Sequence, residues 1–209
     1  MNIKFALPQP RTSLLILAAF LLLTGCGRSV PISYYQLAPV RGEPLPVSLP
    51  ADGDLLLGVG PVRLQEHLER PQLIRRTGTS RLQMADRHRW AEPLAANIAW
   101  VLRDNLATLL ATEHLLLYPW DLATPVDYQV SLEILRCEGA ADGSALLEAR
   151  WTITDRSGKE LLSPRRGSYR QTPPGPDEEG LAAALSEALA SLSAEIAQQL
   201  AQMSTSSTR

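Results

Sequence analysis

An apolar run that leads into a cysteine near the N-terminus decides which part of the chain is free to fold. Lys4 and Arg11 precede the uninterrupted apolar run 14–23, which is about half as long as the roughly 20 residues of a membrane-spanning helix. A basic start, a short apolar run and then small residues are typical of a secretory signal peptide. The run passes into Leu-Thr-Gly-Cys at 23–26. This tetrapeptide has the pattern of a lipobox, in which the thiol of Cys26 accepts a diacylglycerol.

We therefore predict that residues 1–25 are a lipoprotein signal peptide and that Cys26 is the lipid attachment site. Acyl chains such as palmitate would hold the mature chain to a membrane, because each buried methylene contributes about 0.8 kcal/mol. Gly27 follows the cysteine, where aspartate is the usual signal for retention in the inner membrane. The pattern thus favours the outer membrane and its periplasmic face. The alternative is a buried N-terminal helix that ends in Gly-Cys by chance.

The mature chain is long enough for one domain with its own core. The full sequence has 20 basic and 22 acidic residues and no long run of either sign, which argues against a nucleic-acid partner. Cys137 is the only cysteine besides Cys26, so an acylated mature chain cannot form an intramolecular disulfide. No segment after Cys26 approaches the roughly 18 consecutive apolar residues of a transmembrane helix. We expect a domain that is anchored beside the membrane.

The N-terminal part of the mature chain predicts short strands separated by a proline-rich stretch. One strand is expected at 33–37, and a largely buried strand at 55–62. Between them, the prolines of 38–53 exclude helix, so we expect an extended surface segment there. Segments 72–76 and 81–84 predict a β-hairpin.

Apolar residues recur at three- and four-residue steps in two places, which predicts two amphipathic helices. The first begins near Pro93, which suits a first helical turn. The second begins near Asp177, whose acidic neighbours favour the positive end of the helix dipole. The two apolar stripes are Leu94, Ile98, Val101, Leu102, Leu106 and Leu109, and Leu181, Leu185, Leu189, Leu192, Ile196 and Leu200. We expect the second helix to pack across its own sheet; pairing with another subunit is the alternative.

Alternation of apolar and polar residues between the helices predicts an antiparallel meander with one buried face. The alternation covers 128–134 and 147–153, and turn sequences lead into each following strand. A further strand is expected at 115–119. The predicted fold class is α+β, a single domain with a largely antiparallel sheet covered by two amphipathic helices. The predicted segments are a lipidated and proline-rich N-terminus at 26–54, the domain at 55–203 and a disordered tail at 204–209.

No pattern in the sequence indicates catalysis, a metal or a cofactor. His67, His88, His114 and Cys137 have no metal-ligand spacing. Gly58-Val59-Gly60 is a fragment of a nucleotide fingerprint, and a closely packed strand is the simpler interpretation. A catalytic site assembled from separated residues remains the alternative to a non-enzymatic protein.

Arginines gather around the predicted hairpin and suggest a partner-binding surface. They are Arg75, Arg76, Arg81, Arg87 and Arg89. They could bind lipid phosphates or an acidic partner surface. Acidic residues are interspersed among them, so a solvated hairpin face is the competing interpretation. Trp90 is either an interface aromatic or, as we favour, a core residue at the entry of the first helix. The candidate partner-binding residues are Arg75, Arg76, Arg89 and Trp90.

Three stretches carry a resemblance to a known family. They are Tyr-Tyr-Gln-Leu at 34–37, Arg-Pro-Gln-Leu-Ile-Arg-Arg at 70–76 and Arg-Trp-Ala-Glu-Pro-Leu at 89–94. Together with Tyr118-Pro119 and the Ala/Leu-rich last helix, they make the chain resemble the PqiC-type outer-membrane lipoproteins, or ABC-type transport auxiliary lipoproteins. The resemblance runs through nearly the whole mature chain.

The resemblance implies a non-enzymatic part of an envelope lipid transport system. Its partner would be a PqiB-like MCE-domain protein of the inner membrane and, through it, a polytopic inner-membrane protein, and the system would support membrane integrity. Family members occur beside paraquat-inducible transporters, the setting we favour, and beside MCE systems with an ATPase. Because MCE proteins form rings, a symmetric homo-oligomer would match the contact. A structural lipoprotein that stabilises outer-membrane or cell-wall assemblies is the alternative.

Overall fold

The structure is a computed structural model that describes residues 30–39, 55–121 and 123–207, with side chains as far as 203. The predicted signal peptide, Cys26 and most of the predicted proline-rich segment lie outside the described residues. The chain divides into two units, Met1–Pro31 and Ile32–Arg209. Every strand and helix below belongs to the second unit.

The predicted antiparallel meander forms one side of the sheet. It consists of β6 (Tyr128–Gly139), β7 (Ala145–Asp155) and β8 (Glu160–Gln171), with β7 between the other two. Alternate residues of β6 and β7 are buried on one face, because successive side chains of a strand point to opposite sides. The prediction of a meander with one buried face is confirmed.

Shorter strands extend the sheet along the other side of β6. Strand β2 (Leu57–Leu64) runs parallel to β6 and also pairs with β5 (Leu115–Leu117). After the short 3-10 helix Glu66–Leu68, β3 (Gln72–Arg76) and β4 (Leu82–Trp90) form the predicted antiparallel hairpin, and β1 (Ser33–Tyr35) runs parallel to β4. Within the described residues the sheet has eight strands. Most of its paired residues are antiparallel, which confirms the predicted α+β class.

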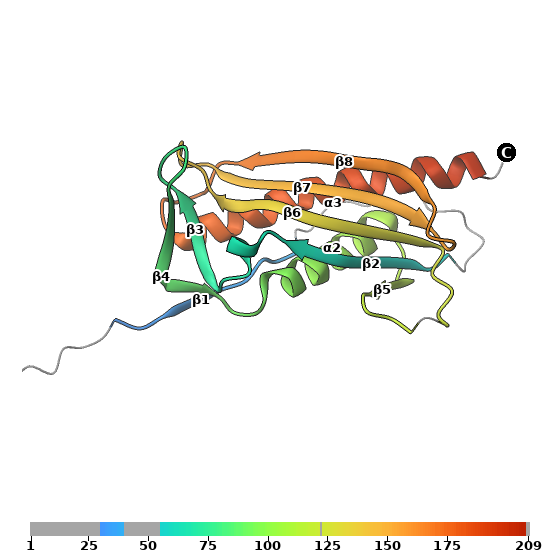
Figure 1. Ribbon diagram of the computed structural model, residues 1–209, viewed down its shortest axis with the longest axis horizontal. Helices are drawn as coiled ribbons and strands as arrows, with labels where there is room; N and C mark the ends of the chain where they lie inside the picture. The colour runs from blue at the N-terminus through green and yellow to red at the C-terminus, as the bar shows by residue number, and fades with distance from the viewer. Residues whose placement is uncertain (1–29, 40–54, 122, 208–209) are drawn as a thin grey trace, which may run out of the picture. The chain divides into compact units, whose positions relative to one another are not determined.

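Helices α2 (Leu94–Leu110) and α3 (Glu178–Ser207) cover one face of this sheet, as Figure 1 shows. Pro93 directly precedes α2, and the Asp177 carboxylate accepts a 2.8 Å hydrogen bond from the Gly180 amide at the start of α3. Both helices therefore begin where the sequence predicts. Helix α3 continues to Ser207, into the segment for which a disordered tail is predicted. The folded unit also begins with β1, before the predicted domain boundary at 55.

The apolar stripes of the two helices form the core against the sheet. All six predicted stripe residues of α3 are at most 1% exposed, and Leu109 is the one predicted α2 residue that is only partly buried. Residues Glu178–Met203 are long and apolar enough to cross a membrane by length and composition, but 67% of that apolar window is buried inside the protein. The predicted packing of α3 on its own sheet is confirmed.

Buried polar contacts fix the N-terminal strand and the helices relative to each other. The Asn97 side chain on α2 accepts a 2.6 Å hydrogen bond from the Leu37 amide and donates one of 3.3 Å to the Leu37 carbonyl. Asn105 of α2 donates to the Ser193 hydroxyl of α3 at 3.1 Å. Asn97 thus holds the chain just after β1 as a backbone partner would.

Candidate docking surfaces

The side chain of Arg75 on β3 contacts the start of α3, and its guanidinium makes its polar contacts there. Its Nε is 3.0 Å from a carboxylate oxygen of Glu178, and its Nη2 donates to the Asp177 carbonyl at 2.9 Å. The guanidinium therefore satisfies backbone and carboxylate groups in the first turn of α3. This arrangement ties the hairpin to the helix.

Arg76 points to a different part of the sheet, where it neutralises a buried carboxylate. Its Nε lies 2.7 Å from Glu138 Oε1, and Arg136 Nη2 lies 2.6 Å from the same oxygen. Glu138 is fully buried, with 0% of its surface exposed. A buried carboxylate needs paired cations of this kind, because removing its charge from water costs roughly several kcal/mol. Arg76 therefore has a structural role in this region.

Arg89 and Trp90 end β4 and have opposite environments. Trp90 is 6% exposed and belongs to the core, as favoured from the sequence. Arg89 is half-buried and lies beside Tyr34 of β1 in the strand register. Its Nε is buried without a hydrogen-bond partner, as is Oε1 of Gln72 across from it on β3. The four candidate partner-binding residues thus do not share one free surface. Among them, only Arg89 reaches solvent and lacks an ion pair with any other described residue.

An aromatic pair that the sequence does not predict lies on the face of the sheet opposite to α2 and α3. Tyr118 and Trp120 follow β5, and their rings meet edge to face with centroids 5.5 Å apart. The Tyr118 amide donates to the Val59 carbonyl of β2 at 2.9 Å. A Cβ on Gly58 would lie only 2.5 Å from the Trp120 ring. The glycine therefore makes the room that the indole occupies, and we call this pair the aromatic shelf.

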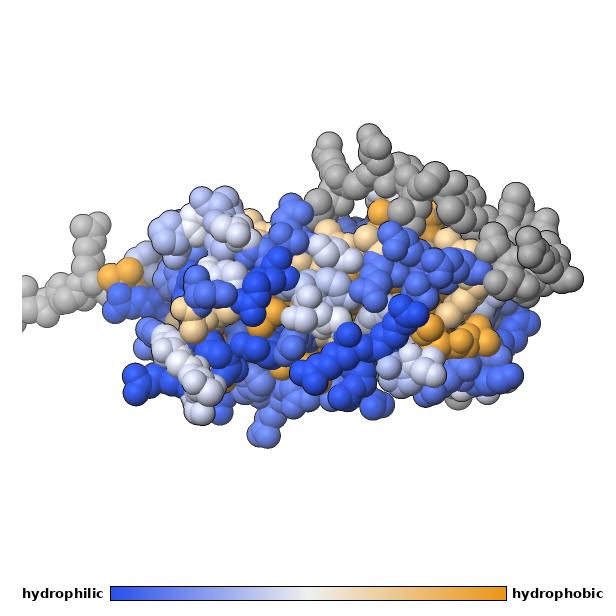
Figure 2. All heavy atoms as spheres, turned by 90° about the horizontal axis from the view of Figure 1, so that it is seen from above, coloured by the Kyte–Doolittle hydropathy of each residue, from blue (hydrophilic) through white to orange (hydrophobic). Residues whose placement is uncertain are grey.

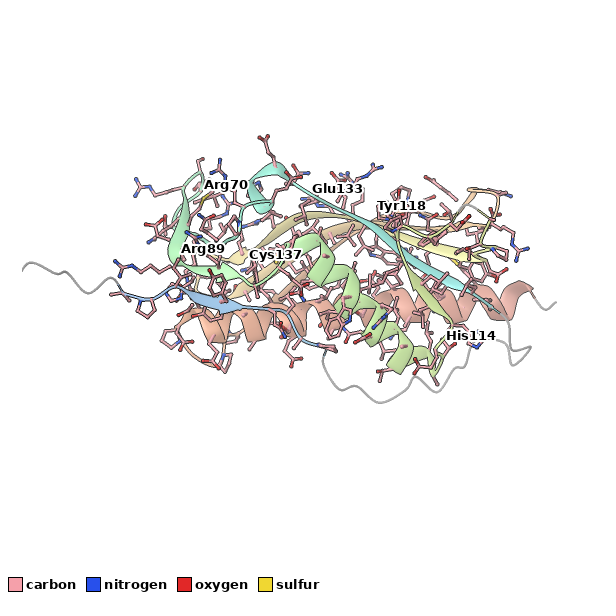
Figure 3. The ribbon with its side chains drawn as sticks, turned by 90° about the horizontal axis from the view of Figure 1, so that it is seen from below. Arg70, Arg89, His114, Tyr118, Glu133 and Cys137 are labelled. Atoms are coloured by element: carbon pink, nitrogen blue, oxygen red, sulfur yellow. The ribbon has the colours of Figure 1, made fainter. Side chains whose placement is uncertain are left out.

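The aromatic shelf is closely packed against β2, and Tyr118 remains open to solvent. Tyr118 is 53% exposed. Gly60 adopts φ +111°, and a Cβ there would lie 2.9 Å from the Tyr118 Cβ, so a side chain at either glycine conflicts with the shelf. In Figure 3, Tyr118 and Glu133 lie on the side of the sheet that faces away from α2 and α3. In the sequence, the alternate glycines Gly58 and Gly60 indicate this packing, because glycines in a strand mark the close approach of another group.

The remainder of this outer sheet face carries charged and apolar residues side by side. A hollow of about 390 Å³ is lined by Pro61, Arg63, Ser131, Leu132, Glu133, Arg150, Trp151, Thr152 and Pro164. Strand β8 ends the sheet with Pro164, Arg165 and Arg166 exposed, and charged residues and proline on an edge strand discourage pairing with other strands. Figure 2, which views the unit from the β8 side, shows mostly hydrophilic side chains with separate small apolar patches.

The groups that carry reactive chemistry are dispersed. Among the described residues, no group of three His, Cys, Asp or Glu side chains is placed to hold a metal ion. Cys137 lies in the core, where burial and the nearby Glu138 raise the pKa of its thiol to about 12. A thiol with that pKa is a poor nucleophile near neutral pH.

Comparisons with known proteins agree with the fold and extend over nearly all of it. A sequence model of a family described as ABC-type transport auxiliary lipoprotein component matches residues 35–197. The intermembrane transport lipoprotein PqiC of Escherichia coli is 27% identical over 87% of this chain and 96% of its own length, and PqiC of Shigella flexneri gives the same values. The crystal structure of protein XCC0632 from Xanthomonas campestris superposes with a TM-score of 0.71, at 17% identity, over 85% of this chain and 99% of that one.

Proposed function

We propose a function from one established premise: the chain belongs to the family of ABC-type transport auxiliary lipoprotein components. Family and relatives indicate an envelope-associated lipoprotein with an auxiliary role in transport. We propose more specifically that the protein is lipid-anchored at Cys26 to the periplasmic face of the outer membrane. There it docks a PqiB-like MCE-domain protein that is anchored in the inner membrane, together with that protein's polytopic partner, and so supports lipid transport and membrane integrity.

The extent of the family match carries this proposal. The matched region, residues 35–197, begins in β1 and ends near the last turns of α3, so it includes both helices and the sheet on which they pack. The lipobox at 23–26 lies just ahead of it. Anchor and domain therefore occur in the order that a lipidated dock requires, and no catalytic residue is needed for that role.

The aromatic shelf is the surface that supports a protein contact best. Exposed Tyr and Trp side chains dominate many protein interfaces because they bury large areas with little loss of side-chain freedom. Here the ring of Trp120 is seated on Gly58 before any partner arrives, so binding would cost little ordering. A symmetric homo-oligomer of the lipoprotein would present several shelves to a ring-shaped partner.

A crosslinked pull-down of the tagged lipoprotein from membranes tests this function. We expect an MCE-domain protein among the captured partners, less of it with Cys26→Ala, because the unanchored protein leaves the membrane, and less with Tyr118→Ala. Leu161→Ala is the matched control, since Leu161 is an exposed apolar residue on β8. Capture of cell-wall or outer-membrane assembly proteins in place of an MCE protein would refute the transport role and favour a structural lipoprotein.

A further inference from the structure

The covalent chain limits how far the domain can be from the membrane that anchors it. Cys26 and Ile32 are six residues apart, and a fully extended chain spans at most about 3.6 Å per residue. If Cys26 is acylated, Ile32 lies within about 22 Å of the lipid interface in every orientation of the domain. The first surface that the anchored domain can bring to the lipid is therefore the one around β1.

Two large apolar side chains are exposed at that position. Ile32 is 41% exposed and Tyr34 is 62% exposed, the highest value among the large hydrophobic residues described. As alternate residues of an extended segment, they point to the same side. Tyrosine is enriched at membrane interfaces, where its ring contacts the acyl boundary and its hydroxyl remains hydrated.

This exposure is not the result of a loose chain end. Strand β1 pairs with β4, and the Ala91 amide donates to the Tyr35 carbonyl at 2.7 Å. A hydrogen bond of 2.8 Å joins the Tyr35 hydroxyl to Nδ1 of His88. One side of β1 is thus bound to the core region, while the side that carries Ile32 and Tyr34 is left open.

Arginines without carboxylate partners lie in the same region. Arg89 is next to Tyr34 in the parallel register, and Arg87 and Arg70 are exposed. Within the part of the chain that the structure describes, none of the three forms an ion pair. A guanidinium matches the geometry of a phosphate group with two parallel hydrogen bonds. The exposed acidic residues Glu69, Asp86 and Glu92 are close in sequence, so the region offers phosphate contacts without a large net positive charge.

We propose that the surface formed by Ile32, Tyr34 and Arg89 rests on the phospholipid surface, with Tyr34 at headgroup level and Arg89 on a lipid phosphate. The inference rests on the proposed acylation of Cys26. It orients the domain: the turn between β7 and β8, which lies at the opposite end of the sheet from β1 in Figure 1, points into the periplasm. The aromatic shelf is then on a face that a partner from the inner membrane can reach.

Depth-dependent quenching in vesicles tests this orientation. The full-length acylated protein with Tyr34→Cys is labelled with a fluorophore and reconstituted with nitroxide-bearing phosphatidylcholine. Labelling is selective, because acylation consumes Cys26, and Cys137 is buried with a thiol pKa raised to about 12. Lys159→Cys, in the exposed turn between β7 and β8, is the matched control. We expect several-fold stronger quenching at position 34 than at 159, and weaker quenching at 34 when Arg89→Gln is added.

The experiment distinguishes failure of the proposed orientation from failure of the proposed acylation at Cys26. Protein that floats with the vesicles but shows equal quenching at positions 34 and 159 would overturn the orientation and leave the anchor intact. Protein that does not float at all would refute acylation at Cys26, and the orientation with it. Quenching that occurs only when phosphatidylglycerol is added would also overturn the proposal, because phosphatidylcholine already supplies the phosphate that Arg89 is inferred to bind.

Discussion

Substitution of Gly58 by alanine measures how firmly the aromatic shelf is seated on β2. The added Cβ would lie 2.5 Å from Cη2 of Trp120 and 2.9 Å from two further ring carbons. Ordinary carbon contacts are about 3.5–4.0 Å, so the indole must move by about 1 Å or leave the strand. Forcing extra volume into a packed site costs about 1–3 kcal/mol. Replacing a strand glycine with alanine returns about 0.5–1 kcal/mol.

Gly78→Ala is the control for the backbone contribution. Gly78 lies in the turn between β3 and β4, and a Cβ there would meet its nearest atom, the Arg81 Cβ, at 3.8 Å. This variant therefore gains the reduced freedom of the unfolded chain without a steric conflict. We expect the free energy of unfolding of Gly58→Ala to be lower than that of Gly78→Ala by about 1–3 kcal/mol, which is the steric cost alone.

Urea unfolding of the mature chain carrying Cys26→Ser gives both values under one condition. With a slope of about 2 kcal/mol per molar urea, the two midpoints should differ by about 0.5–1.5 M. Gly58→Ala should also reduce capture of the partner as Tyr118→Ala does, because both change the aromatic shelf. Equal midpoints for the two glycine variants, with unchanged tryptophan emission, would refute the reasoning that Trp120 is packed against Gly58.

Three further predictions concern groups inside the domain. Glu138→Ala leaves Arg76 and Arg136 without their buried carboxylate and should lower the free energy of unfolding by about 3–5 kcal/mol. Glu133→Ala breaks an exposed ion pair and should lower it by less than about 1 kcal/mol. Similar urea midpoints for the two variants would contradict this prediction. Cys137 should react with a thiol reagent at pH 8 only after unfolding, because burial raises its pKa to about 12; rapid modification of the native Cys26→Ser protein would show the opposite. Burial and the hydrogen bond to Glu195 raise the pKa of Tyr169. The folded state therefore keeps the phenol proton at a pH of roughly 10, where the unfolded chain releases it. The free energy of unfolding should therefore fall above about pH 10, and less steeply in Tyr169→Phe; identical pH profiles would exclude this source.

The elements that the sequence predicts well are those in which local pattern and burial agree. The period of two in β6 and β7 and the leucine stripe of α3 each depend on residues within one element. The parallel pairs are different, because β1 meets β4 and β2 meets β6 only after the chain has folded. No periodicity in β2 indicates whether its neighbour runs parallel or antiparallel.

The candidate partner-binding residues show why a surface is harder to predict than a core. Arg75 and Arg76 are adjacent in sequence, yet Glu178 and Glu138 neutralise them from 103 and 62 residues away. Such distant carboxylates give no local sign in the sequence. Trp90 is easier to interpret, because it lies a few residues before the start of a helix. The aromatic shelf required two distant segments to be combined, and only the glycines of β2 hinted at it.

The composition of α3 also matters before the chain folds, if the chain crosses the inner membrane in an unfolded state. During such a crossing, Glu178–Met203 would meet the inner membrane as a segment of transmembrane length and hydropathy, with no sheet to cover its leucines. Glu187 and Glu195 lie within it, and a charged side chain such as Asp in the middle of a membrane segment costs about 2.5–3.5 kcal/mol. These two glutamates, one exposed and one bonded to Tyr169 in the folded domain, oppose arrest of the segment in the bilayer. In such a crossing, the polar residues of this core helix would favour passage of the segment through the membrane over its retention there.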